Sequence, residues 1–151
     1  MSAPARGGGP GEAGETVTGL AHVAIATPEA DALAALLVSA LGATLGAEEV
    51  LDGGALRVVF VHLGPVTLEL LEPHAADHTV AKFLAARGAG LHHVSLEVAD
   101  LAAALERCRR AGVRLVDLTP RAGAHASRIA FLHPKSLGGV LVELCERRRK
   151  S

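Results

Sequence analysis

The chain has 151 residues, half of them apolar, and a formal net charge of −1 at neutral pH. This length predicts one domain or two small modules that share a core. The near-zero charge, the absence of Trp and Tyr and the lack of any apolar run of about 20 residues exclude most nucleic-acid and membrane binding.

Both ends of the chain predict tails. Residues 1–18 are rich in Gly, Ala, Pro and Glu without a hydrophobic segment, which predicts a disordered tail rather than a secretory signal. The basic residues 147–151 predict a second, solvated tail. Cys108 and Cys145 are isolated, so we expect reduced thiols in a cytoplasmic protein. In a eukaryote the mitochondrial matrix would be the alternative, although residues 1–18 contain no clear transit peptide.

The first half, residues 19–74, begins with an alternating segment, Leu20–Thr27, which predicts a strand. Ala30–Leu41 carries Leu and Ala on one stripe and precedes Gly42, which predicts a helix that ends at a glycine. Turn sequences then separate three further predicted strands, at Thr44–Leu51, Leu56–Leu63 and Val66–Leu71.

A connecting helix is predicted within residues 77–88, and the same order then restarts in residues 90–146. Leu91–Ala99 predicts a strand, and Asp100 is the expected N-cap of a helix at Leu101–Ala111. The last three predicted strands are Val113–Leu118, Arg128–His133 and Val140–Cys145.

The order β-α-β-β-β therefore occurs twice, and residues 19–146 are expected to form a single domain. The predicted fold class is α+β: two βαβββ modules that form one curved, open, mixed β-sheet around a cavity, with the helices on its outer face. A repeated module also predicts that equivalent side chains of the two halves meet at a pseudo-twofold axis.

Two His and two Glu occupy matching places in these repeats. His22 and His93 are 71 positions apart, and Glu69 and Glu143 are 74 positions apart. The short strings around them are Gly19–Val23 and Gly90–Val94 for the His, and Leu68–Leu70 and Val142–Leu144 for the Glu.

A carboxylate inside an apolar strand needs a partner, and a divalent metal ion is one such partner. Taken alone, each His is more often a hydrogen-bonded core residue, and each Glu is more often exposed. The matching places of His22, Glu69, His93 and Glu143 favour a metal site in the cavity. Strand alternation places His92 on the face opposite to His93. We expect Glu72 and Glu146 to be exposed.

Longer strings carry a resemblance that covers residues from about Gly19 to Glu146. They are Leu68–Pro73, Ala81–Leu84, Gly88–His93, Arg128–Ser136 and Gly139–Leu144. In these strings the chain resembles the vicinal oxygen chelate (glyoxalase/bleomycin resistance/dioxygenase) superfamily, and within it the methylmalonyl-CoA epimerases. The resemblance implies a homodimer that interconverts (2R)- and (2S)-methylmalonyl-CoA, an acyl-CoA substrate, in propionate metabolism.

The resemblance also implies site residues and a cofactor. It implies that His22, Glu69, His93 and Glu143 bind one divalent ion, Co²⁺ or Mn²⁺ first and Zn²⁺, Ni²⁺, Fe²⁺ or Mg²⁺ as alternatives. Epimerisation at C2 needs two bases on opposite faces, and Glu143 is the implied first base. The second lies in the first-half hairpin, where Val58 replaces a Glu of the family. Asp52 is the nearest carboxylate there and is our candidate.

The loop Pro120–Ser127 is expected to cap the cavity, with Gly123, His125 and Ser127 as candidate substrate-binding residues; a plain hairpin loop is the alternative. Two other functions stay open: a glyoxalase I-like lyase that acts on a thiol adduct, and a metal-free small-molecule binding protein of the same fold. The string Phe131–Ser136 favours the epimerase. Ethylmalonyl-CoA and methylmalonyl-CoA differ by one methylene, which a pocket distinguishes by only about 1–3 kcal/mol.

Overall fold

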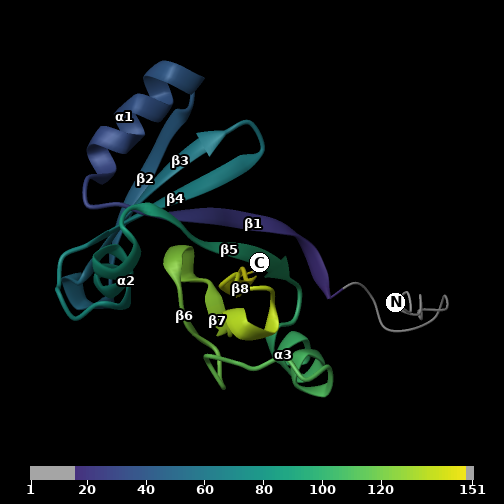
Figure 1. The fold of residues 1–151 in the computed structure, drawn as a ribbon. Helices are drawn as coiled ribbons and strands as arrows, with labels where there is room; N and C mark the ends of the chain where they lie inside the picture. The colour runs from purple at the N-terminus through teal and green to yellow at the C-terminus, as the bar shows by residue number, and fades with distance from the viewer. Residues whose placement is uncertain (1–15, 149–151) are drawn as a thin grey trace, which may run out of the picture.

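The structure is a computed structural model that describes residues 16–148. These residues form one eight-stranded sheet with three α-helices (Figure 1). The first repeat contributes β1 (Val17–Ala26), α1 (Ala30–Leu41), β2 (Thr44–Leu51), β3 (Leu56–Leu63) and β4 (Val66–Pro73). Helix α2 (Thr79–Arg87) leads to the second repeat, which contributes β5 (Gly90–Val98), α3 (Leu101–Arg110), β6 (Arg121–Ala122), β7 (Arg128–Leu132) and β8 (Val142–Glu146). The loops contain the 3₁₀ turns η1 (Asp52–Gly54), η2 (Ala124–Ala126) and η3 (Pro134–Ser136).

The two repeats join through their first strands. β1 and β5 pair antiparallel at the centre of the sheet, and the strand order is β2-β3-β4-β1-β5-β8-β7-β6. Within each repeat the first strand also pairs in parallel with the last, β1 with β4 and β5 with β8. The sheet is therefore mixed and pseudo-symmetric about the β1–β5 pair, which confirms the predicted arrangement of two βαβββ modules.

Helices α1 and α3 cover the outer face of the sheet in the same way. Ala30 and Ala34 of α1 pack against β3 and β4, and Leu101 and Leu105 of α3 pack against β7 and β8. Because successive strand residues point to opposite faces, the residues between these contacts face the concave side. Helix α2 lies on the concave side, where Val80 packs in a cluster with residues of β1, β3 and β4.

A carboxylate at the end of each repeat's last strand holds the start of that repeat's helix. Glu72 Oε2 accepts a hydrogen bond from the Ala30 N–H at 2.8 Å, and Glu146 Oε2 accepts one from the Leu101 N–H at 2.6 Å. Both Glu side chains are half-buried, whereas the sequence predicted exposed ones. They are half-buried because they satisfy helix N–H groups that have no partner within the helix.

The segment 113–118 does not form the predicted strand. Only Leu115 makes a β-bridge, to the end of β7. Val116 and Asp117 both donate their N–H groups to the carbonyl of Phe131, and the Asp117 carboxylate accepts from the Phe131 N–H at 2.8 Å. A side-chain carboxylate therefore takes the place of a backbone acceptor and interrupts the ladder, so that regular pairing resumes only in β6.

The sheet begins inside the expected N-terminal tail. Strand β1 starts at Val17 because Val17 is the register partner of Val98 on β5. The last two residues of the predicted tail, 1–18, therefore belong to a strand, and residues 1–15 lie outside the described residues.

The start of the basic segment 147–151 lies against the sheet. Arg147 donates to the carbonyl of Ala21 at 3.4 Å and pairs with Glu97 at 3.4 Å. Residues 149–151 lie outside the described residues, so the prediction of a basic tail is untested there. The division into two tails and one domain stays a prediction.

Candidate metal centre and active site

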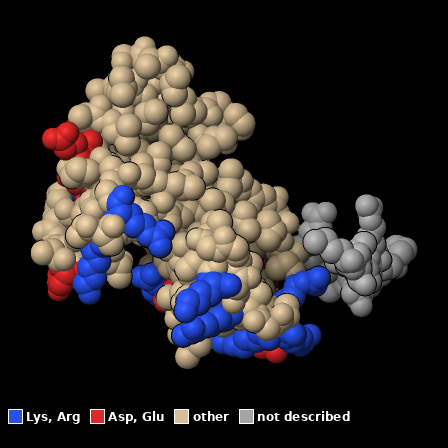
Figure 2. All heavy atoms as spheres, in the orientation of Figure 1, with Lys and Arg blue, Asp and Glu red and all other residues tan. Residues whose placement is uncertain are grey.

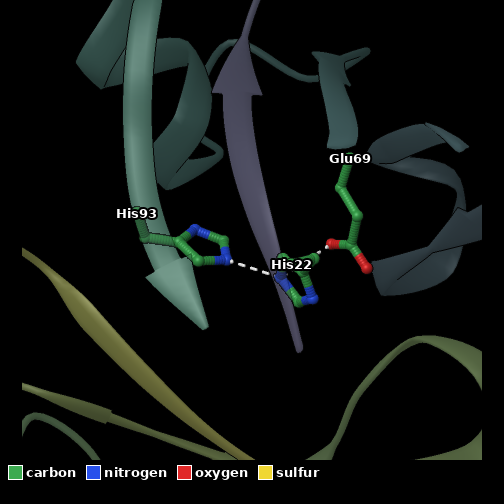
Figure 3. A group of neighbouring side chains, drawn as sticks. All are labelled: His22, Glu69 and His93. Carbon is green, nitrogen blue, oxygen red and sulfur yellow. Dashed lines mark hydrogen bonds and ion pairs between the residues drawn. The ribbon is translucent and has the colours of Figure 1, made fainter. Parts of the chain in front are cut away.

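Four buried side chains from four neighbouring strands converge at the centre of the sheet. His22 lies on β1, Glu69 on β4, His93 on β5 and Glu143 on β8. Each residue is 8% exposed or less. Figure 3 shows the His22, Glu69 and His93 side chains pointing toward one another from three strands. The structure therefore brings together all four residues that the sequence predicted as ligands.

The strand register explains this convergence. Ala24 on β1 is the partner of Glu69 on β4 and of His93 on β5. In the other repeat, Ser95 on β5 is the partner of His22 and of Glu143. Each of these two rows of register partners thus aligns the His of one repeat with the Glu of the other repeat. The pseudo-twofold axis runs between the two rows.

The distances within the cluster suit metal ligands. His22 Nε2 lies 3.1 Å from His93 Nε2 and 3.1 Å from Glu69 Oε2. Glu143 Oε1 is 3.5 Å from His22 Nε2, and its Oε2 is 3.7 Å from His93 Nε2. The ligand atoms of His22, Glu69 and His93 all lie within 4.8 Å of one another.

Burial keeps both imidazoles uncharged at neutral pH. Removal from water lowers the pKa of His22 to about 4, with smaller contributions from the charges of Arg147 and His125. It lowers the pKa of His93 to about 2, and His22 and His92 contribute in the same direction. A neutral imidazole offers the lone pair that a metal ion needs.

Burial has the opposite effect on the two carboxyl groups. It raises the pKa of Glu69 to about 8, and the charges of Glu143 and Glu49 add to the increase. It raises the pKa of Glu143 to about 7, although the hydrogen bond from Ser95 opposes the increase. A bound cation would favour the charged form of both groups. The set of two imidazoles and two carboxylates therefore fits a divalent first-row ion.

Ser95 is a site residue that the sequence analysis missed. It is fully buried, and its hydroxyl donates to Glu143 Oε1 at 2.7 Å. The signal was its position two residues after His93, which places both side chains on the same face of β5. The matching residue of the first repeat is Ala24, which has no hydroxyl to offer Glu69.

His92 also faces the cavity, so the prediction that it points away from His93 was wrong. The register between β1 and β5 shifts at this point, because Ala24 pairs with His93 but Ile25 pairs with Leu91. This bulge leaves the extra residue unpaired and turns both rings toward one side. The two Nδ1 atoms are 2.8 Å apart. When Nδ1–H of His93 donates to His92, Nε2 of His93 is free to bind an ion.

A cavity of about 880 Å³ opens over the cluster on the concave side of the sheet. Its lining includes the four predicted ligands and the basic side chains of Arg121, Arg147 and Arg148. Figure 2 shows Lys and Arg gathered over α2 and around β6, β7 and α3, whereas the part formed by α1 is mostly uncharged. The cavity can therefore receive an anionic molecule.

The other predicted site residues line this cavity as well. Asp52 in η1 accepts a hydrogen bond from His78 Nε2 at 2.7 Å. Gly123, His125 and Ser127 lie in the loop between β6 and β7. The Ser127 hydroxyl donates to a carbonyl within this loop at 2.7 Å, so the loop is folded partly by its own polar groups. The roles of these four residues stay predictions.

Known proteins resemble this chain in sequence and in fold. Residues 21–131 match the family model of the Glyoxalase/Bleomycin resistance protein/Dioxygenase superfamily. The chain is 41% identical over 127 residues to the ethylmalonyl-CoA/methylmalonyl-CoA epimerase of Cereibacter sphaeroides, which covers 83% of this chain and 95% of that relative.

Solved structures agree with this relationship. The crystal structure of methylmalonyl-CoA epimerase from Mycobacterium tuberculosis matches with a TM-score of 0.84 and 39% identity, over 91% of this chain and 93% of that chain. A methylmalonyl-CoA epimerase in complex with methylmalonyl-CoA and NH₄⁺ matches with a TM-score of 0.80 and 34% identity, over 87% of this chain and 95% of that chain. The chain belongs to the methylmalonyl-CoA epimerase family of the Glyoxalase/Bleomycin resistance protein/Dioxygenase superfamily.

Proposed function

We propose that this chain is a methylmalonyl-CoA epimerase, which interconverts the (2R) and (2S) forms by moving the proton at C2 through an enolate of the thioester. The observation that carries this function is the buried cluster of His22, Glu69, His93 and Glu143 beneath a cavity with basic lining. Family membership adds the substrate class, since related structures contain methylmalonyl-CoA or 2-nitronate-propionyl-CoA.

We further propose that this cluster binds one divalent ion, with Co²⁺ or Mn²⁺ as the expected ions. The bound ion would supply a Lewis acid that draws electron density from the substrate carbonyl and carboxylate. His22 and His93 offer neutral Nε2 atoms, and Glu69 offers a carboxylate without a hydrogen-bond donor from Ala24. The hydrogen bond between His92 and His93 orients the His93 ring, and the hydrogen bond from Ser95 orients the Glu143 carboxylate.

Glu143 is the residue to which we assign the first proton transfer. Its Oε1 is held by the Ser95 hydroxyl, which leaves Oε2 to take or return the C2 proton. Burial raises the pKa of Glu143 to about 7. This pKa is that of the ion-free protein, and a bound cation would favour the carboxylate, which is the form that accepts the C2 proton. Asp52 is the candidate for the second base that the sequence indicates.

The basic lining supports an acyl-CoA as the substrate. Guanidinium groups bind phosphate and carboxylate oxygens through paired N–H donors, and Arg121, Arg147 and Arg148 all line the cavity. Gly123, His125 and Ser127 stay the candidates for contacts with the acyl group.

Proton NMR in D₂O tests this function. Loss of the C2 proton signal from (2R)-methylmalonyl-CoA, together with appearance of the (2S) epimer, is the expected result for protein loaded with a divalent ion. Chelated protein is expected to lose the activity, and the Glu143→Gln variant is expected to form no (2S) epimer. Wild-type protein that exchanges the C2 proton with no divalent ion would contradict the metal role, and no exchange under any condition would contradict the epimerase.

A homodimer, a role in propionate metabolism and a cytoplasmic location stay predictions. In residues 16–148 no helix has the length and apolar character that crossing a lipid bilayer requires. Cys108 and Cys145 are free thiols, as the sequence predicted.

A further inference from the structure

We infer that His125 is the second proton-transfer residue of the epimerisation, and that Glu49 is the residue that positions it on the cavity wall opposite Glu143. This inference rests on the proposed function. The enolate is planar at C2, so the two proton transfers must come from opposite sides. Glu143 serves one side, and the other side needs a titratable group of its own.

The two repeats form opposing walls of the cavity. In the second repeat, Glu143 on β8 is the register partner of Phe131 on β7. In the first repeat, the matching pair is Glu69 on β4 and Phe60 on β3. A group that serves the face of C2 opposite Glu143 is therefore expected on the wall that contains Glu69 and Phe60. The neighbouring residue on the same face of β3 is Val58, which cannot transfer a proton.

His125 occupies this place, although it belongs to the second repeat. The loop that contains η2 crosses the cavity, and the His125 ring lies edge-on to Phe60 with the centroids 4.2 Å apart. The ring lines the same cavity as the four ligands.

Glu49 holds the loop in this position. It is the register partner of Val58, so its side chain lies on the concave face of the sheet. Both carboxylate oxygens of Glu49 accept the backbone N–H of His125 at 3.1 Å. His125 has a φ of 54° and Ala126 a φ of 55°, a left-handed backbone conformation that residues other than glycine rarely adopt. A contact from the other repeat thus stabilises an unusual backbone under the His125 ring.

The same carboxylate selects which ring nitrogen is free. Glu49 Oε1 lies 3.8 Å from Nδ1 of His125, so its negative charge favours the tautomer with the proton on Nδ1. The Nε2 lone pair is then available to the cavity. A base on the cavity wall opposite Glu143 needs this arrangement, because only an unprotonated nitrogen can accept the C2 proton.

Among the other titratable groups that line the cavity, Glu69 is assigned to the ion, and three more make hydrogen bonds of their own. His78 Nδ1 accepts the Val80 N–H at 3.1 Å, so its Nε2 carries a proton and donates it to Asp52 at 2.7 Å. This bond ties the Asp52 carboxylate to His78 at the tip of the hairpin. The Nδ1 atom of His62 lies 3.2 Å from the Thr67 hydroxyl. Asp52 is therefore the competing candidate for the second proton transfer.

Each epimerisation removes one proton from C2 and returns one to it. In one direction Nε2 of His125 takes the proton from C2: the C–H bond breaks, its electron pair enters the enolate and an N–H bond forms. Glu143 in its carboxylic form then gives its proton to the opposite face of C2. The reverse direction exchanges the two roles, and exchange with solvent returns both groups to their starting protonation states.

Deuterium exchange from each pure epimer tests the assignment. In D₂O, the wild-type protein is expected to exchange C2 hydrogen from both epimers with inversion. His125→Asn is expected to slow inversion by about 100-fold or more, while the epimer that Glu143 deprotonates still exchanges with retained configuration. Glu143→Gln is expected to exchange, with retained configuration, only the epimer that His125 deprotonates. His133→Asn removes a histidine that does not line the cavity and is the matched control; its inversion rate is expected to equal that of the wild type.

Chemical rescue separates proton transfer from a structural role. Free imidazole is expected to restore inversion to His125→Ala but not to Glu143→Gln, which a misfolded loop could not reproduce. Glu49→Gln is expected to lower kcat for inversion without changing KM or the one-sided exchange through Glu143.

Several results would overturn the inference. His125→Asn that inverts at the wild-type rate, or Asp52→Asn that alone produces one-sided exchange, would assign the second transfer elsewhere. His125→Ala that imidazole does not rescue would leave His125 only a structural role. Wild-type protein that exchanges neither epimer would refute the proposed function itself, which distinguishes that failure from the failure of His125.

Discussion

Ser95 donates a hydrogen bond to Glu143 at 2.7 Å, whereas the matching residue beside Glu69 is Ala24. The two carboxylates occupy equivalent places in the repeats, yet only Glu143 is held by a hydroxyl. Burial raises the pKa of both groups, to about 8 for Glu69 and to about 7 for Glu143, where the Ser95 hydrogen bond opposes the increase. This single difference makes Glu143 the better oriented of two otherwise matched groups.

Removal of the Ser95 hydroxyl is expected to affect both stability and activity. Ser95→Ala leaves Glu143 Oε1 buried without its donor, so the free energy of unfolding is expected to fall by about 1–3 kcal/mol. The value of kcat is expected to fall more than KM rises, because the orientation of the proton acceptor changes. Urea denaturation and steady-state kinetics measure the two effects. Ser95→Cys, of similar size but a weaker donor, should be intermediate, and wild-type values for Ser95→Ala would contradict this role.

The ligand set predicts how ion binding depends on individual side chains. His93→Ala is expected to abolish saturable Co²⁺ or Mn²⁺ binding, measured by calorimetry on chelated protein. His92→Phe keeps an aromatic ring but removes the hydrogen-bond partner of His93, so a loss of about 10–100-fold in affinity is expected. An ion at 100 times its dissociation constant is expected to add about 2.7 kcal/mol to the stability of the wild type. Equal stabilisation of His93→Ala would place the ion elsewhere.

The stability of the chelated protein is expected to depend on pH with two opposing slopes. Burial lowers the pKa of His22 to about 4 and of His93 to about 2, so below pH 6.5 the unfolded chain binds more protons and stability falls as the pH falls. It raises the pKa of Glu69 to about 8 and of Glu143 to about 7, so stability falls as the pH rises from 4.5 toward 8.

The two effects predict that the chelated protein is most stable between about pH 4.5 and 6.5, where the contributions oppose each other. Urea denaturation at a series of pH values measures this dependence. Glu69→Gln is expected to flatten the alkaline side and leave the acid side unchanged. A wild-type stability that increases between pH 6.5 and 8 would contradict the assignment.

The two carboxylates that hold the helix starts are expected to contribute similarly to stability. Glu72→Ala or Glu146→Ala removes an acceptor from the first turn of α1 or α3, with an expected loss of about 0.5–2 kcal/mol each. Glu106→Ala, an exposed position on α3, is the control and is expected to change stability by about 0.5 kcal/mol or less. Losses no larger than that of the control would show that solvent satisfies the helix N–H groups equally well.

Much of this molecule could be predicted from its sequence, because glycine turns and hydrophobic periodicity are local signals. Helix α1 and strands β2 and β3 have the predicted bounds, and the matching of the two repeats identified four side chains that the fold brings together. The segment 113–118 was predicted incorrectly, because periodicity cannot show that a carboxylate will replace a backbone acceptor. His92 was placed on the wrong face because a bulge depends on pairing with another strand.

The contact between Glu49 and His125 had no sequence signal at all. The two residues are 76 positions apart and belong to different repeats, and they meet only because a loop of one half crosses to a wall of the other. Neither residue has a counterpart at a matching place, so comparison of the repeats could not reveal the pair. Such contacts depend on the curvature of the sheet, which only the folded chain defines.

The central β1–β5 pair has a consequence for how such a site can arise. Each repeat supplies one His and one Glu, so half of the chain would need a second copy of itself to assemble four donors. Two identical copies would have to carry the same residue at both members of every equivalent pair. Covalent fusion of the two repeats removes that constraint. The place that Ala24 has in the first repeat can then hold Ser95 in the second, and a loop of one repeat can cross the cavity although the other repeat has no such loop. A symmetric scaffold thereby gains the two unlike faces that inversion of a stereocentre demands.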